Sequence, residues 1–148
     1  DKHQRLVQKF MFSKLQKLLD KYPGLGIGID TVKVLSGTFG QDKIIKSCQM
    51  FCRTHNVPHY FVPTPFTSQR CMKCGNVSRE SLRKLLKDYY LCIHCSHKVH
   101  ADLNAARNIA LFAKTLQDAG FGMVGTLDME YSIKSYEILH KKFGLPKK

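Results

Sequence analysis

Apolar residues recur with a helical period along four stretches of the chain. In residues 6–22 they stand three or four positions apart, basic residues fill most of the other positions, and Pro23-Gly24 ends the pattern, which predicts an amphipathic helix. Further helices are predicted over residues 42–55, 102–117 and 132–142. The packed face expected for the third of these consists of Val99, Leu103, Ala106, Ile109, Ala110, Ala113 and Leu116.

Two apolar runs between these helices are expected to be strands. Residues 25–35 read as one buried strand or a strand pair, with glycines where another group approaches the backbone closely. Residues 59–62 form a second run, which Pro63 and Pro65 stop. The alternation of helices and strands predicts an α/β layered fold. Because a sheet of so few strands is small, we expect the chain to be the end of a longer protein.

The charge of the chain favours a polyanionic partner. Its 148 residues include 24 lysines and arginines against 11 aspartates and glutamates, a formal net charge of +13. Nucleic acid is the commonest polyanion, although a generally basic soluble protein would show the same excess. The 43% share of hydrophobic residues argues against disorder, and no apolar run is long enough to span a membrane. The first residues show no signal-peptide pattern.

Four of the six cysteines form two Cys-x-x-Cys pairs: Cys71, Cys74, Cys92 and Cys95. Two such turns, brought together, complete the tetrahedral sulfur shell that Zn²⁺ favours, so the spacing predicts a zinc ribbon with one structural ion. Gly75 suits the left-handed conformation that such turns need, and Ser96 stands at the matching position of the second pair. Disulfides and a thioredoxin-like redox motif are the alternatives, but the first lacks a secretory signal and the second needs a single pair.

Other potential ligands lie near these pairs or on the second predicted helix. His94, His97 and His100 could substitute as ligands, or could lie at the surface or contact nucleic acid. Cys48 and Cys52 lie four residues apart on a predicted helix, and we expect them to be buried apolar side chains.

Three elements of the sequence occur in a specific order. They are Thr67-Ser68-Gln69-Arg70-Cys71-Met72-Lys73-Cys74-Gly75, then Cys92-Ile93-His94-Cys95, then Asp102-Leu103-Asn104-Ala105-Ala106-Arg107-Asn108-Ile109. Together they resemble the C-terminal signature of the TnpB/Fanzor family of transposon-encoded RNA-guided nucleases, which is related to the type V CRISPR effectors. The match is strong over residues 67–109 and holds only in pattern over 44–65. Ala101 stands where the family usually has arginine.

The resemblance implies a partial RNase H-like (RuvC) mixed sheet of the α/β class with an inserted four-cysteine zinc ribbon. The C-terminal portion of the nuclease domain would occupy residues 1–66, and the ribbon, which would bind target nucleic acid, residues 67–98. The last RuvC-like helix would occupy residues 99–118, and a C-terminal tail residues 119–148.

The resemblance also implies a catalytic site. The family holds two divalent ions on an Asp, a Glu and an Asp in chain order and hydrolyses phosphodiesters, and Mg²⁺ suits this work in the complete protein. Asp102 matches the third carboxylate, Asp30 stands where the glutamate is expected, and the first carboxylate would lie upstream of residue 1. Each acid also has a simpler explanation: Asp102 as an N-cap and Asp30 as a turn residue.

Nucleic-acid contacts are expected from polar and basic side chains in and after the ribbon: Thr67, Ser68, Arg70, Lys73, Arg79, Arg83, Lys84, Lys87, Asn104 and Arg107. The Thr67-Ser68 pair could instead start the ribbon turn, and Asn104 and Arg107 could cap and pair. Four aromatic residues could stack on unpaired bases, with burial favoured for Phe61: Tyr89, Tyr90, Phe61 and Phe66.

Three functions fit these observations. The first is an RNA-guided DNA endonuclease whose partners are guide RNA, target DNA and the polypeptide upstream of residue 1, with no membrane. It would be intracellular, in the cytoplasm of a prokaryote or the nucleus of a eukaryote. The second is a nuclease-dead relative that acts as a guided DNA-binding regulator, because the Glu and Arg of the pattern are missing. The third is a zinc-ribbon adaptor for another protein. Residues 1–148 alone are not expected to cleave.

Overall fold

The computed structural model describes residues 2–30, 41–63, 65–83, 88–121 and 129–147. Its elements follow in this order: α1 (Lys2–Lys21), β1 (Ile27–Asp30), α2 (Gln41–Thr54), β2 (His59–Val62), α3 (Glu80–Arg83), β3 (Tyr89–Leu91), β4 (Lys98–His100), α4 (Ala101–Asp118) and α5 (Met129–Phe143). The four predicted helices and the strand at residues 59–62 are confirmed within a few residues at each end. Within this described part, no helix combines the length and apolarity that a membrane span needs.

The strands β1 and β2 form a parallel pair. Their register runs from Ile27 opposite His59 to Asp30 opposite Val62. Parallel neighbours need a crossover connection, and α2 lies between the two strands in the chain. Residues 31–35, predicted as a continuation or a second strand, lie outside the described residues. The sheet that the structure describes is therefore two-stranded and parallel, while the RNase H-like mixed sheet stays a prediction.

The two faces of this sheet pack against different helices. One face packs mainly on α1 and α2, with one residue from α5 (Tyr131), in a core made of Leu15, Ile29, Cys48, Phe51, Cys52, Val57, Phe61 and Tyr131. The other face packs on α4 and α5, in a core made of Tyr60, Val62, Phe112, Ala113, Leu116, Leu139 and Leu145. The result is a layered α/β arrangement, and the predicted burial of Cys48, Cys52 and Phe61 is confirmed.

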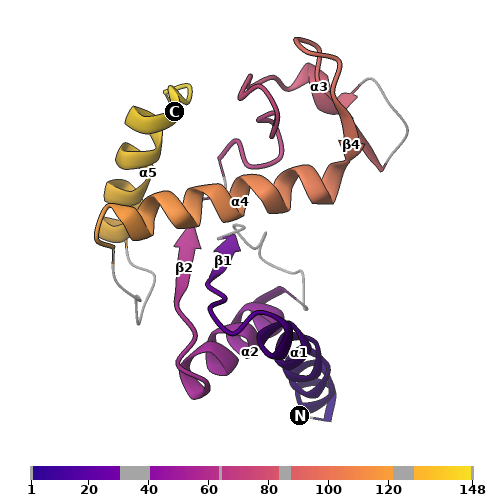
Figure 1. The fold of residues 1–148 in the computed structure, drawn as a ribbon, viewed down its shortest axis with the longest axis vertical. Helices are drawn as coiled ribbons and strands as arrows, with labels where there is room; N and C mark the ends of the chain where they lie inside the picture. Colours follow the sequence, from indigo (N-terminus) through magenta and orange to yellow (C-terminus); the bar gives the residue numbers. More distant parts are fainter. Residues whose placement is uncertain (1, 31–40, 64, 84–87, 122–128, 148) are drawn as a thin grey trace.

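The helix α4 joins the two halves of the molecule. Figure 1 shows it lying across the ends of β1 and β2, with the β3–β4 hairpin at one end and α5 at the other. Its close approach to β1 depends on Gly28, because a Cβ there would lie 3.0 Å from the Cβ of Ala113. The expectation that glycines mark a close backbone approach is confirmed at this position.

The packed face predicted for α4 is partly wrong. The structure exposes Leu103, Ala106 and Ala110 and buries Asn104, Asn108, Phe112, Ala113 and Leu116. The face is rotated toward the asparagines because their amides are hydrogen-bonded to another segment of the chain, which removes most of the cost of burying them.

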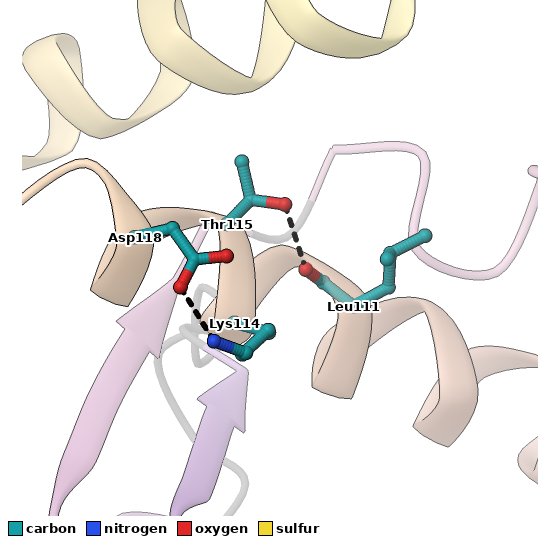
Figure 2. Close-up of polar contacts among 4 residues, drawn as sticks. All are labelled: Leu111, Lys114, Thr115 and Asp118. Carbon is teal, nitrogen blue, oxygen red and sulfur yellow. Dashed lines mark hydrogen bonds and ion pairs between the residues drawn. The ribbon is translucent and has the colours of Figure 1, made fainter.

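Polar side chains in the second half of α4 bond within the helix itself. Lys114 pairs with Asp118, and the Thr115 hydroxyl donates to the carbonyl of Leu111 at 2.9 Å (Figure 2). These contacts join residues four positions apart, as helical spacing allows. Long-range polar contacts described for α4 are made by the two asparagines in its first half, Asn104 and Asn108.

Candidate metal centre and nucleic-acid interface

Both Cys-x-x-Cys pairs lie on the same kind of turn. In the first turn the N–H of Gly75 donates to the Cys71 carbonyl, and in the second the N–H of Ser96 donates to the Cys92 carbonyl, each at 2.9 Å. Gly75 has a φ of 80° and Ser96 a φ of 59°, so both residues are left-handed. Ser96 adopts the conformation of Gly75 despite its Cβ. The two turns are therefore equivalent halves of one site.

The four cysteine sulfurs converge. All four Sγ atoms lie within 4.8 Å of one another, with Cys71 to Cys95 at 3.8 Å and Cys74 to Cys92 at 3.6 Å. A tetrahedral shell with Zn–S bonds of about 2.3 Å has edges of about 3.8 Å. In the described part of the chain, this is the one group of three or more Cys, His, Asp or Glu side chains placed to share an ion. The cysteines could thus hold a metal ion, and their sulfur donors suit Zn²⁺.

The thiols of this four-cysteine site differ in acidity. Burial raises the pKa of Cys74 to about 12 and also raises the pKa of Cys71. Burial acts in the same direction on Cys92, but backbone N–H groups of Cys95 and His94 favour its thiolate, and its pKa falls to about 7. Four thiols this close cannot all ionise unless a cation lies between them, and a coordinated cation deprotonates thiols outright.

A small core lies beneath the cysteines. Tyr90 is fully buried with Cys71 and Cys92, and its hydroxyl donates to the carbonyl of Gln69 at 3.2 Å. Burial raises the pKa of Tyr90 to about 12. The hypothesis that Tyr90 stacks on bases is therefore wrong, since its ring has no exposed face.

The outer face of the β3–β4 hairpin carries a different set of side chains. The strands are antiparallel with Tyr89 opposite His100. Tyr89 is 42% exposed, the Lys98 Nζ lies 4.9 Å from its ring centroid, and the His100 ring centroid lies at 6.1 Å. We name Tyr89, Lys98 and His100 the hairpin face. It offers an aromatic ring and two basic groups to solvent, side chains of the kinds that contact single-stranded nucleic acid in other proteins.

Asp102 lies in the first turn of α4 and is almost fully exposed. Its side chain is 96% accessible and its Oδ2 lies 3.8 Å from the His100 Nδ1. The cap of α4 is His100, whose Nδ1 accepts the backbone N–H of Asp102 at 3.3 Å. The N-cap alternative for Asp102 is therefore wrong, and its carboxylate is open to ligands.

Asp30 ends β1 on the side of the sheet that faces α4. The hydroxyl of Thr67 donates to its Oδ2 at 3.2 Å. Thr67 is buried, and its carbonyl accepts the side-chain amide of Asn108 at 2.9 Å. The segment that follows Asp30 lies outside the described residues, so the turn alternative for this residue stays open.

Among the residues that the structure describes, neither acid belongs to a group of three or more side chains placed to share an ion. Thr67 links Asp30 to Asn108 on α4, because its hydroxyl donates to Asp30 and its carbonyl accepts from Asn108. Asn108 lies six residues after Asp102 in this helix, a rise of about 9 Å. The oxygens of the two acids are donors that Mg²⁺ prefers. This chain would supply part of such a site, and the roles of Asp30 and Asp102 stay predictions.

The residues expected to contact nucleic acid divide into two groups. Exposed side chains belong to Ser68, Lys73, Arg79 and Arg107, while Thr67 and Asn104 are buried and Arg70 is half-buried. The Arg70 guanidinium donates to the Asn108 Oδ1 at 3.0 Å and lies 5.0 Å from the Phe143 ring centroid. These contacts favour an internal role for Arg70, Asn104 and Thr67. Lys84, Lys87 and the side chain of Arg83 lie outside the described residues.

One residue of this region was not recognised in the sequence. Asn108 is 1% exposed and bonds both to Arg70 and to Thr67. The signal was its spacing: Asn104 and Asn108 stand one helical turn apart in an otherwise Ala- and Leu-rich helix.

Comparisons with known proteins agree with this architecture. Residues 42–109 match the family described as Cas12f1-like, TNB domain. A segment of 46 residues, 31% of the chain, is 44% identical to the CRISPR-associated endodeoxyribonuclease Cas12f1 of Sulfoacidibacillus thermotolerans and covers 10% of that protein.

A solved structure shares the fold. It is the cryo-EM structure of the Cas12f1-sgRNA-target DNA complex, with a TM-score of 0.56 and 19% identity over 72% of this chain and 32% of that chain. The chain thus spans about a third of the protein it resembles in structure. These similarities support a relationship to type V CRISPR effectors, and the assignment to the transposon-encoded TnpB/Fanzor branch stays a prediction.

Proposed function

We propose that this chain is the C-terminal part of an RNA-guided DNA endonuclease, and that its four cysteines hold a structural Zn²⁺. The observation that carries the proposal is the match over residues 42–109, which includes both cysteine turns, Asp102 and the first turns of α4. The charge of +13 and the exposed basic side chains around the ribbon support contact with nucleic acid. In such proteins guide pairing reads the sequence while the protein holds backbone and shape.

Catalysis would use Asp30 and Asp102 together with a carboxylate supplied by the rest of the polypeptide. Divalent ions, when bound there, supply Lewis-acid stabilisation of the phosphodiester oxygens. The exposure of Asp102 leaves its oxygens accessible for such binding. Thr67 would orient the Asp30 carboxylate through its 3.2 Å hydrogen bond.

The catalytic proposal is tested with the full-length protein, its guide RNA and a matching target. Asp102→Ala should reduce the cleavage rate by several orders of magnitude and leave target binding intact. The matched control is Asp118→Ala, which removes an exposed carboxylate from the other end of the same helix (Figure 2). An unchanged cleavage rate in Asp102→Ala would contradict the catalytic role assigned to Asp102.

Nucleic-acid binding by the ribbon would use the hairpin face. A base stacked on the exposed ring of Tyr89 would contribute about 1–3 kcal/mol. Tyr89→Ala should therefore weaken single-stranded DNA binding about tenfold, and Lys98→Ala should lower the slope of log K against log salt by about 1.

A second exposed tyrosine with a lysine beside it provides the control. Tyr22 is 50% exposed, and the Lys21 Nζ lies 5.3 Å from its ring centroid, at the end of α1. Tyr22→Ala should leave binding unchanged. Equal losses for Tyr22→Ala and Tyr89→Ala would contradict the assignment to the hairpin face. Salt-independent binding would instead favour a protein-binding adaptor.

One observation favours a second function, a nuclease-dead regulator that binds DNA. Asp30 is one methylene shorter than the glutamate that the resemblance leads one to expect, so its carboxylate reaches less far. Mg²⁺-dependent nicking of target DNA by the native full-length protein would rule out the regulator. The regulator would be established if the native protein bound target DNA with its guide but did not nick it, and if Asp30→Glu then cut the target.

A further inference from the structure

Two buried amides on α4 form a connected polar feature between this helix and the first cysteine turn. Asn104 is 0% exposed and Asn108 is 1% exposed. Their spacing places them on one face of the helix. A buried amide without partners destabilises a fold by a few kcal/mol, so the partners of these two side chains define what they do.

Asn104 holds the first cysteine turn. Its Nδ2 donates to the Arg70 carbonyl at 2.9 Å, and its Oδ1 accepts the N–H of Met72 at 3.0 Å. These two backbone groups flank Cys71 on both sides. The position of that cysteine is thereby fixed to α4 by two hydrogen bonds.

Asn108 holds the segment that leads into the same turn. Its Nδ2 donates to the carbonyl of Thr67 at 2.9 Å and to that of Arg70 at 2.6 Å, while its Oδ1 accepts from the Arg70 guanidinium at 3.0 Å. The side chain of Thr67 then donates to the Asp30 carboxylate at 3.2 Å. An uninterrupted path of hydrogen bonds and chain thus runs from Cys71 to Asp30.

We propose that Asn108 is a positioning residue that couples metal occupancy of the four-cysteine site to the orientation of the Asp30 carboxylate. With the metal bound, Cys71 is fixed, the segment from Thr67 to Arg70 is held against Asn108, and the Thr67 hydroxyl stays on Asp30. Without the metal, the first turn loses its anchor and the hydroxyl leaves the carboxylate. The catalytic meaning of this coupling rests on the function proposed above, but the coupling itself does not.

The test measures the ¹³C resonance of the Asp30 carboxyl in the full chain, loaded with Zn²⁺ and after removal of Zn²⁺ by a chelator. We expect the resonance to shift on metal removal in the unaltered chain. In Thr67→Val, which removes the hydroxyl at nearly constant shape, the shift should disappear, and the affinity for Zn²⁺ should fall by less than about tenfold because the coupling is reciprocal. In Asn108→Ala the affinity for Zn²⁺ should fall about tenfold, as for other groups that orient metal ligands.

The matched control is Thr115→Val. Its hydroxyl donates to the Leu111 carbonyl within α4 (Figure 2), so the same substitution removes a hydrogen bond outside the path. The Asp30 shift on metal removal should persist in this variant. Thr67→Val keeps the test decisive even where Asn108→Ala does not fold, because it changes a single hydroxyl.

Two outcomes would overturn the coupling. One is an Asp30 carboxyl resonance that does not change when Zn²⁺ is removed from the unaltered chain. The other is a change on Zn²⁺ removal that is still observed in Thr67→Val. Neither measurement uses cleavage. If the protein shows the expected shifts but does not cleave, the coupling stands and only the endonuclease proposal is refuted. If the protein cleaves but its Asp30 resonance does not respond to Zn²⁺, only the coupling is refuted.

Discussion

The two candidate metal sites of this molecule are built in opposite ways. The four-cysteine site takes all its sulfurs from residues 71–95, on two turns that share the same backbone hydrogen bonds. The acids Asp30 and Asp102 come from a strand and a helix that meet only through tertiary packing. The first site is therefore set by local geometry, and the second by how closely α4 packs on β1.

This difference predicts that metal binding and the global stability of the fold are separable, even though the contacts of Asn108 and Thr67 couple metal occupancy to the orientation of Asp30. Substitutions in the ribbon turns should change metal binding first, whereas substitutions between β1 and α4 should change global stability and leave the cysteines in place. Four predictions test this separation, beginning with the one of largest expected effect.

Cys92→Ser should remove the metal and much of the order of the ribbon. Structural zinc contributes about 10–16 kcal/mol of apparent binding free energy in small zinc-dependent domains, and a three-sulfur site loses most of it. The measurement is the zinc content per chain, which should fall from one to near zero.

The control for this change is Cys52→Ala. Cys52 is fully buried in α2, outside the four-cysteine site. Its truncation should cost about 1–2 kcal/mol of unfolding free energy with zinc content unchanged. A full zinc content in Cys92→Ser would show that the Cys92 sulfur is not required as a ligand.

Gly28→Ala should loosen the packing of α4 on β1. The new Cβ would meet the Ala113 Cβ and the Ile109 Cγ2 at 3.0 Å, and overpacking of this kind costs about 1–3 kcal/mol. Urea unfolding should report that loss while zinc content stays at one. Gly24→Ala is the matched control, since a Cβ there meets no atom within 4 Å. Loss of zinc in Gly28→Ala would contradict the prediction that metal binding and global stability are separable.

The residues at the left-handed positions of the two turns should respond in opposite directions. Gly75→Ala places a Cβ at a φ of 80° and 3.1 Å from the Arg70 Nη2, so zinc affinity should fall by about 1–2 kcal/mol. Ser96→Gly removes a Cβ from the equivalent conformation and should raise affinity or leave it unchanged. Competition with a chromophoric chelator measures both variants. Parallel changes would contradict the equivalence of the turns.

Asp102→Ala should have the smallest effect on folding. Its side chain is 96% exposed and does not cap the helix, so the unfolding free energy should stay within experimental error. Asn104→Ala, two positions along the same helix, should cost about 1–3 kcal/mol because two hydrogen-bonding partners would lose their bonds. Thermal unfolding compares the two, and a large loss for Asp102→Ala would indicate a structural role.

The local features of the fold could be predicted from the sequence. The Cys-x-x-Cys spacing fixes the two turns, and the helical and strand patterns locate α1, α2, β2 and α4 within a few residues. Each of these depends on residues close together in the chain, so the sequence carries the whole signal.

The roles of the polar residues around α4 could not be predicted in the same way. Arginine and asparagine are residue types that bind phosphate or cap helices. In this structure, however, the Arg70 guanidinium bonds to Asn108 of α4, and the side-chain amide of Asn104 bonds to the Arg70 carbonyl. Leu103 is exposed for the same reason, because α4 buries the side-chain amides of Asn104 and Asn108 in place of its leucine. Such roles depend on partners more than thirty residues away in the chain, which no local pattern records.

The junction between the hairpin and α4 has a consequence for engineering. The strand β4 ends at His100 and α4 begins at Ala101, so no linker separates them, and His100 serves both elements. A chimaera that exchanged the ribbon by cutting after residue 98 would divide β4 and leave both asparagines facing a foreign turn. The unit to exchange is instead the ribbon together with the first two turns of α4, which should be transferred as one segment.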